Sequence, residues 1–337
     1  MHSWETRLNQ RDTNRVVRPF EWGLEWTRDW PLVDGEWRGL AGGEAESVHD
    51  LNRRALEDSD RFFAYTTPSD FHLEGNSLRF TSAVRTPYAE NNLAAARWFP
   101  ARGRRAVVVL PQWNADPGGH IGLCRIFNWP GIAVLRLSLP YHDVRKPPEI
   151  ERADYAVSSN IVRTIDACRQ AVVDVRSCLD WLEARGYRQL GIVGTSLGSC
   201  YAFIASAHDE RLKVNVFNHA STYFADVVWT GQSTRHIRAG IESDIDLERL
   251  RKAWLVISPA AYYDKFAARA KKSLLVYASY DLTFPPELSR EIVVEFQRRH
   301  LDYKVAVLPC GHYTSGETPF KFLDAWYMAR FLEQSFD

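Results

Sequence analysis

The sequence GTSLG at residues 194–198 matches the pattern G-x-S-x-G, which can present a serine as a nucleophile. The serine of this pattern occupies a strained turn between a strand and a helix, so its hydroxyl group rises above the sheet. Gly194 and Gly198 allow the strand and the helix to approach closely. The apolar residues 190–193 predict the strand, and a helical pattern starts near Leu197. We therefore predict that Ser196 is a catalytic nucleophile.

A serine hydroxyl is a weak nucleophile until a neutral imidazole takes its proton, and a carboxylate must orient that imidazole. With this kind of turn, the carboxylate and then the histidine follow the serine in the chain, each on a loop after a later strand. Asp281 and His312 each come a few residues after an apolar run that predicts a strand. Asp264 and Asp302 are weaker candidates because neither directly follows such a run. We predict His312 as the general base and Asp281 as its partner.

The negative oxygen that forms during acyl transfer needs two hydrogen-bond donors, which together form an oxyanion hole. The backbone N–H of Leu197, directly after the nucleophile, is expected to be one donor. The second is expected from the loop that follows the apolar residues 106–110. Trp113 is the first choice there and Gln112 the second.

Other apolar runs predict the elements that position these residues. Unbroken apolar runs are typical of strands covered on both faces, and segments with helical spacing lie between them. Strands that alternate with helices indicate an α/β protein with a doubly wound, mostly parallel sheet. The early strands are closer together, which indicates an antiparallel edge. The predicted strands are residues 71–73, 78–84, 93–99, 106–110, 132–135, 190–193, 214–217, 274–278 and 305–308.

A long amphipathic helix is predicted over about residues 153–184, because apolar residues recur there every three or four positions until Gly186. Residues 1–66 are rich in tryptophan and arginine, and we expect them to form a helical or irregular arm packed on the main domain, residues 67–337. Exposed tryptophans are costly, which favours packing. The tryptophans of this arm are Trp4, Trp22, Trp26, Trp30 and Trp37.

Residues from about 221 to 263 are polar, compatible with helix and longer than a simple crossover requires. Long segments of this kind are usually functional, so we predict a helical cap insertion above the sheet. Trp229 and Ile237 are expected to form its apolar underside. The candidate residues of a substrate pocket are His142, His219, Tyr223 and Trp229.

Composition argues against several other functions. Lysine plus arginine and aspartate plus glutamate both number 42, so no general charge draws the chain to nucleic acid. No apolar run approaches the roughly 20 residues of a membrane span, and the N-terminal residues lack the pattern of a signal peptide. The five cysteines include no C-x-x-C pair, which disfavours a disulfide framework and a zinc knuckle. We expect a cytoplasmic protein without a metal or a cofactor.

Over about residues 70–335 the sequence resembles the α/β-hydrolase superfamily. The GTSLG turn, the Asp281 loop with its two following prolines, and the Gly311-His312 loop carry the resemblance. The sequence is also similar to bacterial alpha/beta hydrolase domain-containing proteins, through the turn and the residues ARWFP at 96–100. Many relatives carry His-Gly in the oxyanion loop, where this chain has Pro111-Gln112.

The resemblance implies an α/β-hydrolase fold and an esterase-like enzyme that uses no cofactor. The favoured function is a carboxylic ester hydrolase that forms an acyl-enzyme on Ser196 from a small-molecule ester. A peptidase or a carbon–carbon bond hydrolase on the same three residues is an alternative, and so is a non-enzymatic ligand binder on the same fold. The sequence identifies neither the acyl group nor the oligomeric state.

Overall fold

A nine-stranded sheet forms the centre of the computed structural model, which describes residues 1–32 and 43–336. Its strands are β1 (His72–Glu74), β2 (Ser77–Thr81), β3 (Leu93–Phe99), β4 (Arg105–Leu110), β5 (Ala133–Leu137), β6 (Gln189–Thr195), β7 (Leu212–Asn218), β8 (Lys272–Ala278) and β9 (Asp302–Leu308). Their order in the sheet is β1-β2-β3-β5-β4-β6-β7-β8-β9.

Strands β5, β4, β6, β7, β8 and β9 pair in parallel, whereas β1, β2 and β3 form an antiparallel edge that also pairs antiparallel with β5. A strand therefore lies at each of the nine predicted positions, and the predicted antiparallel edge is confirmed. Parallel strands all end at the same edge of the sheet, so β4, β6, β7, β8 and β9 bring the loops that follow them together.

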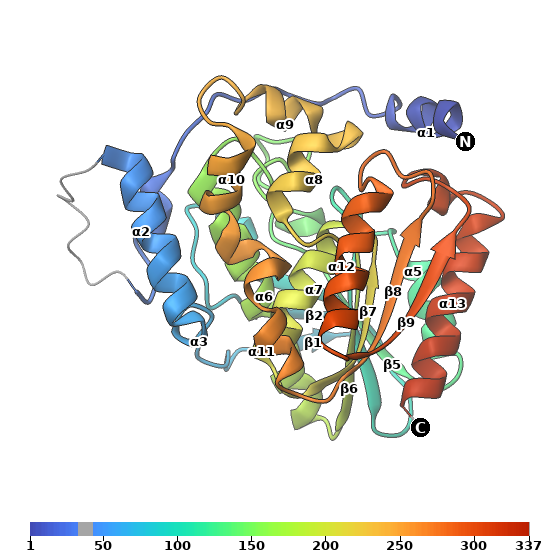
Figure 1. Cartoon of the computed structure of the whole chain (residues 1–337). Coiled ribbons are helices and arrows are strands. Elements are labelled where there is room, and N and C mark those ends of the chain that lie inside the picture. Colours follow the sequence, from blue (N-terminus) through green and yellow to red (C-terminus); the bar gives the residue numbers. More distant parts are fainter. Residues whose placement is uncertain (33–42, 337) are drawn as a thin grey trace.

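Helices connect and cover these strands (Figure 1). The α-helices are α1 (His2–Asn9), α2 (Gly43–Glu57), α3 (Ser59–Phe62), α4 (Ala89–Asn92), α5 (Ile121–Asn128), α6 (Ile161–Ala184), α7 (Leu197–His208), α8 (Phe224–Thr230), α9 (Arg235–Ala239), α10 (Leu247–Ala253), α11 (Tyr263–Ala267), α12 (Pro286–Arg298) and α13 (Phe320–Ser335). Short 3₁₀ turns are η1 (Leu24–Thr27), η2 (Asp143–Arg145), η3 (Gln232–Thr234), η4 (Leu255–Ile257), η5 (Pro259–Ala261) and η6 (Thr314–Gly316).

Two apolar layers hold the helices to the two faces of the sheet. Phe127 of α5 and Phe331 of α13 pack with Val107 and Val109 of β4 on one face. Helices α6, α7 and α12 contribute to the larger cluster on the other face, which includes Val108 of β4. Neighbouring side chains of β4 thus enter opposite layers, which explains why its sequence is apolar without interruption.

Helix α6 starts at Ile161, later than the predicted start near residue 153. Asn160 caps it, because the Asn160 side chain accepts a hydrogen bond from the backbone N–H of Arg163. Most of its side chains are buried, polar ones included, which differs from the predicted amphipathic pattern. The cause is a second layer outside α6: Trp30 donates to Asp166 at 2.8 Å, and Arg169 donates to the carbonyl oxygen of Phe62 at 2.8 Å.

The N-terminal tryptophans differ in burial. Trp30 is buried and Trp22 and Trp26 are half-buried, whereas Trp4 is 38% exposed. Trp4 still contacts Phe320 of α13, with the ring centroids 6.3 Å apart. Trp37 lies outside the described residues.

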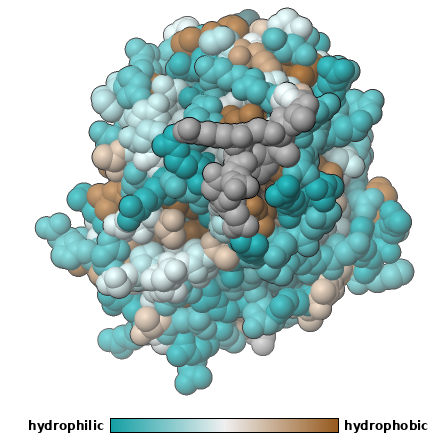
Figure 2. Space-filling view, turned by 90° about the vertical axis from the view of Figure 1, so that its left-hand side faces the viewer, coloured by the Kyte–Doolittle hydropathy of each residue, from teal (hydrophilic) through white to brown (hydrophobic). Residues whose placement is uncertain are grey.

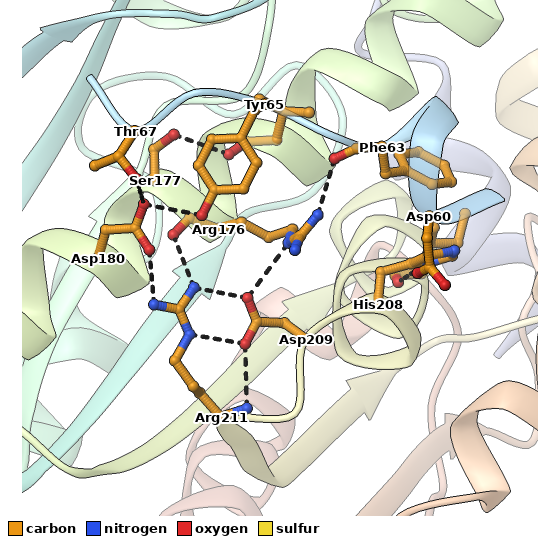
Figure 3. Close-up of polar contacts among 12 residues, drawn as sticks. Asp60, Phe63, Tyr65, Thr67, Arg176, Ser177, Asp180, His208, Asp209 and Arg211 are labelled. Carbon is orange, nitrogen blue, oxygen red and sulfur yellow. Dashed lines mark hydrogen bonds and ion pairs between the residues drawn. The ribbon is translucent and has the colours of Figure 1, made fainter. Parts of the chain in front are cut away.

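The segment after α3 is fixed to the main body by charged groups (Figure 3). Tyr65 and Thr67 both donate to Asp180 of α6, at 2.9 and 2.6 Å. Arg211, in the turn before β7, donates to Asp180 and Asp209. The boundary predicted at residue 66 stays a prediction, since these contacts join its two sides.

The face beside α2 is mostly hydrophilic, with hydrophobic residues scattered over it (Figure 2). Within the described ranges, no helix combines the length and the apolar character needed to cross a membrane. All five cysteines are free thiols; Cys200 is half-buried and the other four are buried.

Only part of the segment 221–263 lies above the sheet. Helices α8 and α9 are at the end toward which the strands point, whereas α10 and α11 run down the side of the molecule near α6 and α7 (Figure 1). Helix α11 contacts α7, and α10 contacts both α2 and α8. The cap function of this segment stays a prediction, and α8 and α9 are the helices placed to serve it.

Candidate active site

Ser196 occupies a strained turn between β6 and α7. Its φ of 55° and ψ of −119° are unusual for a residue with a side chain, and such a conformation costs on the order of 1–3 kcal/mol. Close packing enforces the turn: a Cβ on Gly198 would lie 2.5 Å from the carbonyl oxygen of Leu110, and a Cβ on Gly194 would collide with the backbone of Gly198. The turn therefore has the geometry that the G-x-S-x-G pattern predicts.

Backbone strain gathers at this edge of the sheet. Asn114 after β4, Tyr141 after β5 and His219 after β7 also have positive φ angles, between 54° and 64°. Strained residues persist where the surrounding structure fixes them, and they cluster at functional sites.

Asp281 follows β8 and is buried. Its Oδ1 atom accepts hydrogen bonds from the backbone N–H groups of Thr283 and Phe284 at 2.8 and 2.7 Å. Its Oδ2 atom contacts the Nδ1 atoms of His312 at 3.0 Å and His219 at 2.8 Å. Burial alone would raise the pKa of Asp281, but the two histidines hold that pKa well below its ordinary value. Asp281 is therefore an ionised carboxylate at neutral pH.

His312 follows β9 and stands between Asp281 and the ring of Phe284. The rings of His312 and Phe284 stack with centroids 5.3 Å apart and an interplanar angle of 6°. Burial alone would lower the pKa of His312, but Asp281 raises it above the ordinary value of 6.5. Because Nδ1 faces the carboxylate, the Nε2 atom is the one available for proton transfer.

The structure brings Asp281 and His312 together, but it does not join them to Ser196. Ser196 is not among the hydrogen-bond partners of Asp281 or His312. Its hydroxyl has no hydrogen-bond partner among the described residues. Ser196 instead lines a cavity beside them, together with the neighbouring residue Leu197.

The loop after β4 lies against the Ser196 turn, as the contact between Gly198 and Leu110 requires. Arg136 of β5 holds this loop: it donates to the carbonyl oxygens of Asp116 at 2.7 Å and Gly119 at 2.8 Å. Arg136 is buried and pairs with Asp143 at 2.6 Å. The loop is thus fixed from the neighbouring strand, in a place where it can present a backbone donor.

Trp113 and Gln112 lie on this loop, both half-buried. Trp113 lines the cavity, and its indole N–H donates to the carbonyl oxygen of Ala153 at 2.9 Å. Asn114 follows, with its backbone N–H directed to Nε2 of His142 at 3.0 Å. The side chain of Trp113 is therefore fixed. Leu197 and Trp113 both border the cavity.

The cavity beside Ser196 is small and mostly apolar. Its volume is about 50 Å³, and one water needs roughly 10–15 Å³ on such a measure. Helix α8 and the loop before α12 form much of the wall. The lining residues are Trp113, Val157, Ser196, Leu197, Cys200, Ser221, Phe224, Val227, Val228, Ser233, Thr234, Thr283 and Phe284.

Known proteins share this arrangement of strands and turn. The family model described as "Alpha/beta hydrolase domain containing 18" matches residues 126–279, which include the Ser196 turn. A solved acetyl xylan esterase from a Paenibacillus species superposes with a TM-score of 0.59 over 98% of this chain and 99% of its own, at 12% identity. The chain has the α/β-hydrolase fold. Its predicted α/β-hydrolase fold is thereby confirmed.

Other solved structures have the same fold as this chain. An acylaminoacyl peptidase from Pyrococcus horikoshii has a TM-score of 0.60 at 13% identity over 90% of the chain, but the chain spans only 45% of that peptidase. Acetyl xylan esterase 1 from a Thermoanaerobacterium species has a TM-score of 0.56 at 14% identity, with 93% and 99% of the two chains covered. No curated protein matches the sequence.

The four predicted pocket residues are not among the residues that line the cavity. His142 is buried against the loop after β4, with Nδ1 2.8 Å from the carbonyl oxygen of Pro140. Burial lowers the pKa of His142 to about 4, which keeps it neutral. His219 is buried against Asp281. His142 and His219 use their ring nitrogens for contacts with a backbone carbonyl and a carboxylate, and neither lines the cavity.

Tyr223 and Trp229 flank the cavity-lining part of α8. The guanidinium group of Arg251 lies over the Tyr223 ring, and that of Arg238 lies 4.9 Å from the Trp229 ring centroid. Ile237 is buried beside a separate, smaller cavity. The apolar underside predicted at Trp229 and Ile237 is therefore formed instead by Phe224, Val227 and Val228, which occupy the opposite positions of α8.

One cluster could in principle receive a metal ion. Within the described part of the chain, ligand atoms of His219, Asp281 and His312 all lie within 4.8 Å of one another. Both imidazole Nδ1 atoms already face the Asp281 carboxylate, so a cation there would have to replace these contacts. The arrangement fits a hydrogen-bonded carboxylate better than a metal centre.

Proposed function

We propose that this chain is a serine hydrolase that cleaves carboxylic esters through an acyl-enzyme on Ser196. The observation that carries the proposal is the 3.0 Å contact between Nδ1 of His312 and Asp281, at the sheet edge that also holds the strained Ser196 turn. A buried carboxylate on Nδ1 selects the tautomer whose Nε2 atom accepts a proton.

The proposed reaction has two stages. Nε2 of His312 takes the proton of the Ser196 hydroxyl as the serine oxygen attacks the ester carbonyl, and His312 then gives that proton to the departing alcohol. A water molecule, activated in the same way, releases the acid from Ser196. The backbone N–H groups of Leu197 and Trp113 are the proposed donors to the oxyanion, and one such donor contributes about 3–4 kcal/mol to the transition state.

The Ser196–His312 hydrogen bond is proposed to form when the substrate enters. Such bonds are often long or misaligned in a free site and shorten in the complex. The fixed groups are Asp281, with its four hydrogen bonds, and the strained backbone of Ser196. The Ser196 side chain and the His312 ring are the groups that we propose to move toward each other.

The cavity supports a short acyl group. A volume of about 50 Å³ has room for only a few water-sized groups, at roughly 10–15 Å³ each. With Leu197, Val227 and Val228 at its border, it suits a short acyl group rather than a long chain. The solved esterases that superpose on nearly the whole chain are acetyl xylan esterases. We propose acetyl to butyryl esters as the acyl class and leave the alcohol open.

Peptide hydrolysis is the second candidate, because the Pyrococcus horikoshii acylaminoacyl peptidase has the same fold. The chain spans less than half of that peptidase, whereas it matches the esterases over their full length. Ester cleavage is therefore favoured.

The test is to measure kcat/KM for p-nitrophenyl acetate and for an acetyl-alanine p-nitroanilide. We expect ester hydrolysis to exceed anilide hydrolysis, and Ser196→Ala to lose more than about a thousandfold of it. Ser233→Ala is the matched control, because Ser233 lines the same cavity without a strained turn. Ester turnover that survives in folded Ser196→Ala would exclude the proposed nucleophile.

A further inference from the structure

Helix α1 lies against the loop that carries His312, although the two are about 300 residues apart in sequence. Glu5 of α1 is completely buried. Its Oε1 accepts a hydrogen bond from the backbone N–H of Tyr313 at 2.7 Å. Its Oε2 accepts from the backbone N–H and the hydroxyl of Thr314, at 3.0 and 3.1 Å. One carboxylate thus holds the two residues that directly follow His312.

The contact extends to the residue before His312. The hydroxyl of Thr314, which donates to Glu5, also accepts from the backbone N–H of Gly311 at 2.6 Å. A Cβ on Gly311 would collide with the Glu5 carboxylate, so glycine is required there for the approach. Glu5 and Thr314 together fix the backbone on both sides of His312.

Helix α1 is itself fixed to the neighbouring loops. The ring of His2 lies 5.7 Å from that of Tyr280, which directly precedes Asp281. Thr6 accepts a hydrogen bond from Gln232, in the turn between α8 and α9, at 3.2 Å. Farther along the chain, Arg15 donates to the Tyr313 hydroxyl at 3.1 Å. The N-terminal segment therefore contacts the loops of the acid and of the base.

A buried carboxylate is costly unless hydrogen bonds compensate it, and here all the donors come from the His312 loop. If Glu5 only attached α1 to the loop, it could bind any part of that loop. It instead binds Tyr313 and Thr314, the residues directly after His312, on which the direction of the imidazole depends. We propose that Glu5 is a positioning residue for His312. This inference rests on the proposed function, in which His312 is the general base.

The charge of Glu5 gives the proposal a signature. The titratable groups around His312 are Asp281 after β8, His219 after β7, Tyr313 on its own loop and Glu5 on α1. A negative charge near an imidazole favours its protonated form. Glu5 acts in this direction on the pKa of His312, after the larger effects of burial and Asp281. Removing the charge should lower the pKa of His312.

The experiment compares the full-length protein with Glu5→Gln, which keeps the size but loses the charge and one acceptor. We expect kcat for p-nitrophenyl acetate to fall on the order of tenfold to a hundredfold, since small misplacements of a catalytic group are costly. KM should change less than about twofold, and the acidic limb of the pH profile should move to lower pH. Glu25→Gln is the matched control, because Glu25 is exposed on the same N-terminal segment.

Thr314→Val removes one hydrogen bond to Glu5 but leaves the charge of Glu5 in place. We therefore expect kcat to fall while the pKa of His312 is not lowered. Thr314→Ser keeps the hydroxyl and should have the kcat of the native protein. This pair decides the question if Glu5→Gln does not fold. If Glu5→Gln folds and its kcat is unchanged, the proposal is overturned. If Glu5→Gln does not fold, an unchanged kcat in Thr314→Val overturns it. So does a loss of kcat in Glu5→Gln with an unmoved acidic limb.

An NMR titration of His312 in the native protein and in Glu5→Gln separates this inference from the proposed function. A lowered His312 pKa in a protein that hydrolyses no ester would support the contact while excluding the esterase. Ester turnover with equal kcat and equal His312 pKa in both proteins would overturn the role of Glu5 and leave the esterase intact.

Discussion

The imidazole rings of His219 and His312 lie 4.6 Å apart, centroid to centroid, and both direct Nδ1 to the same oxygen of Asp281. The two rings differ in what their Nε2 atoms meet. Nε2 of His219 is buried without a hydrogen-bond partner among the described residues, whereas His312 retains some solvent exposure. We therefore propose His312, rather than His219, as the histidine that transfers the proton, with His219 as an additional donor to the carboxylate.

We predict that His219→Phe moves the acidic limb of the pH–rate profile upward, by up to about 1 pH unit. The donor that His219 supplies stabilises the charge of Asp281, and a hydrogen bond of this kind contributes about 1 kcal/mol. Without it the carboxylate interacts more strongly with His312 and raises the His312 pKa. His219→Asn is the control, because asparagine can donate from a similar position and tolerates the positive φ of 54°. A limb that stays in place in folded His219→Phe would contradict the prediction.

Ester hydrolysis by the native protein should rise with pH through a midpoint above 6.5. Only the neutral imidazole accepts the serine proton, and the pKa of His312 is raised above 6.5 by Asp281. A raised pKa keeps the ring protonated to higher pH, so activity is low below pH 6.5 and increases as the pH rises through the pKa of His312. Values of kcat/KM, obtained from initial rates between pH 5 and 9, test this pH dependence. A rate independent of pH over this range would exclude His312 as the base.

Shortening the cavity wall should widen the choice of acyl chain. In Val227→Ala and Val228→Ala, the ratio of kcat/KM for butyryl esters to kcat/KM for acetyl esters should rise on the order of tenfold. The smaller side chain leaves space for the additional methylene groups of the butyryl chain. Trp229→Ala is the control on the same helix, because Trp229 does not border the described cavity. Equal ratios in all three variants would show that α8 does not set acyl length.

Gly198→Ala should remove activity by displacing the oxyanion loop. The new Cβ would lie 2.5 Å from the oxygen of Leu110 and 2.6 Å from that of Pro111, so the backbone must shift. Loss of one oxyanion donor lowers kcat on the order of 100- to 1,000-fold. Gly122→Ala in α5 is the control, since nothing lies within 4 Å of its Cβ and alanine favours helix. Full turnover in Gly198→Ala would refute the close approach.

The sequence predicted the parts of the molecule in which local pattern and topology agree. Apolar runs identified the central strands, because β4 to β8 are largely buried and alternate with helices. Asp281 and His312 could be placed for the same reason, since parallel strands bring their following loops to one edge. The start of α6 was predicted too early because residues 153–159 have apolar members but form turns.

Residues that act by reaching across the fold were not predictable. Glu5 contacts a loop about 300 residues away, and no local pattern connects them. Arg136 left a faint signal, a lone charge inside the apolar strand β5, but its partners lie in another loop. Tyr223 and Trp229 were predicted to line the pocket, but Phe224, Val227 and Val228 line it instead. The rotation of α8 about its axis decides which of its residues face the cavity, and the sequence does not give that rotation.

The central claim is that Ser196 is an activated nucleophile, and covalent labelling tests it most directly. The native protein would be treated with a fluorophosphonate probe and the modified residue identified by peptide mass spectrometry, with Ser196→Ala and heat-unfolded protein alongside. We predict stoichiometric modification at Ser196 alone in the native protein and none in the other two samples. Labelling at a different residue, or a folded native protein that takes up no probe, would contradict the account.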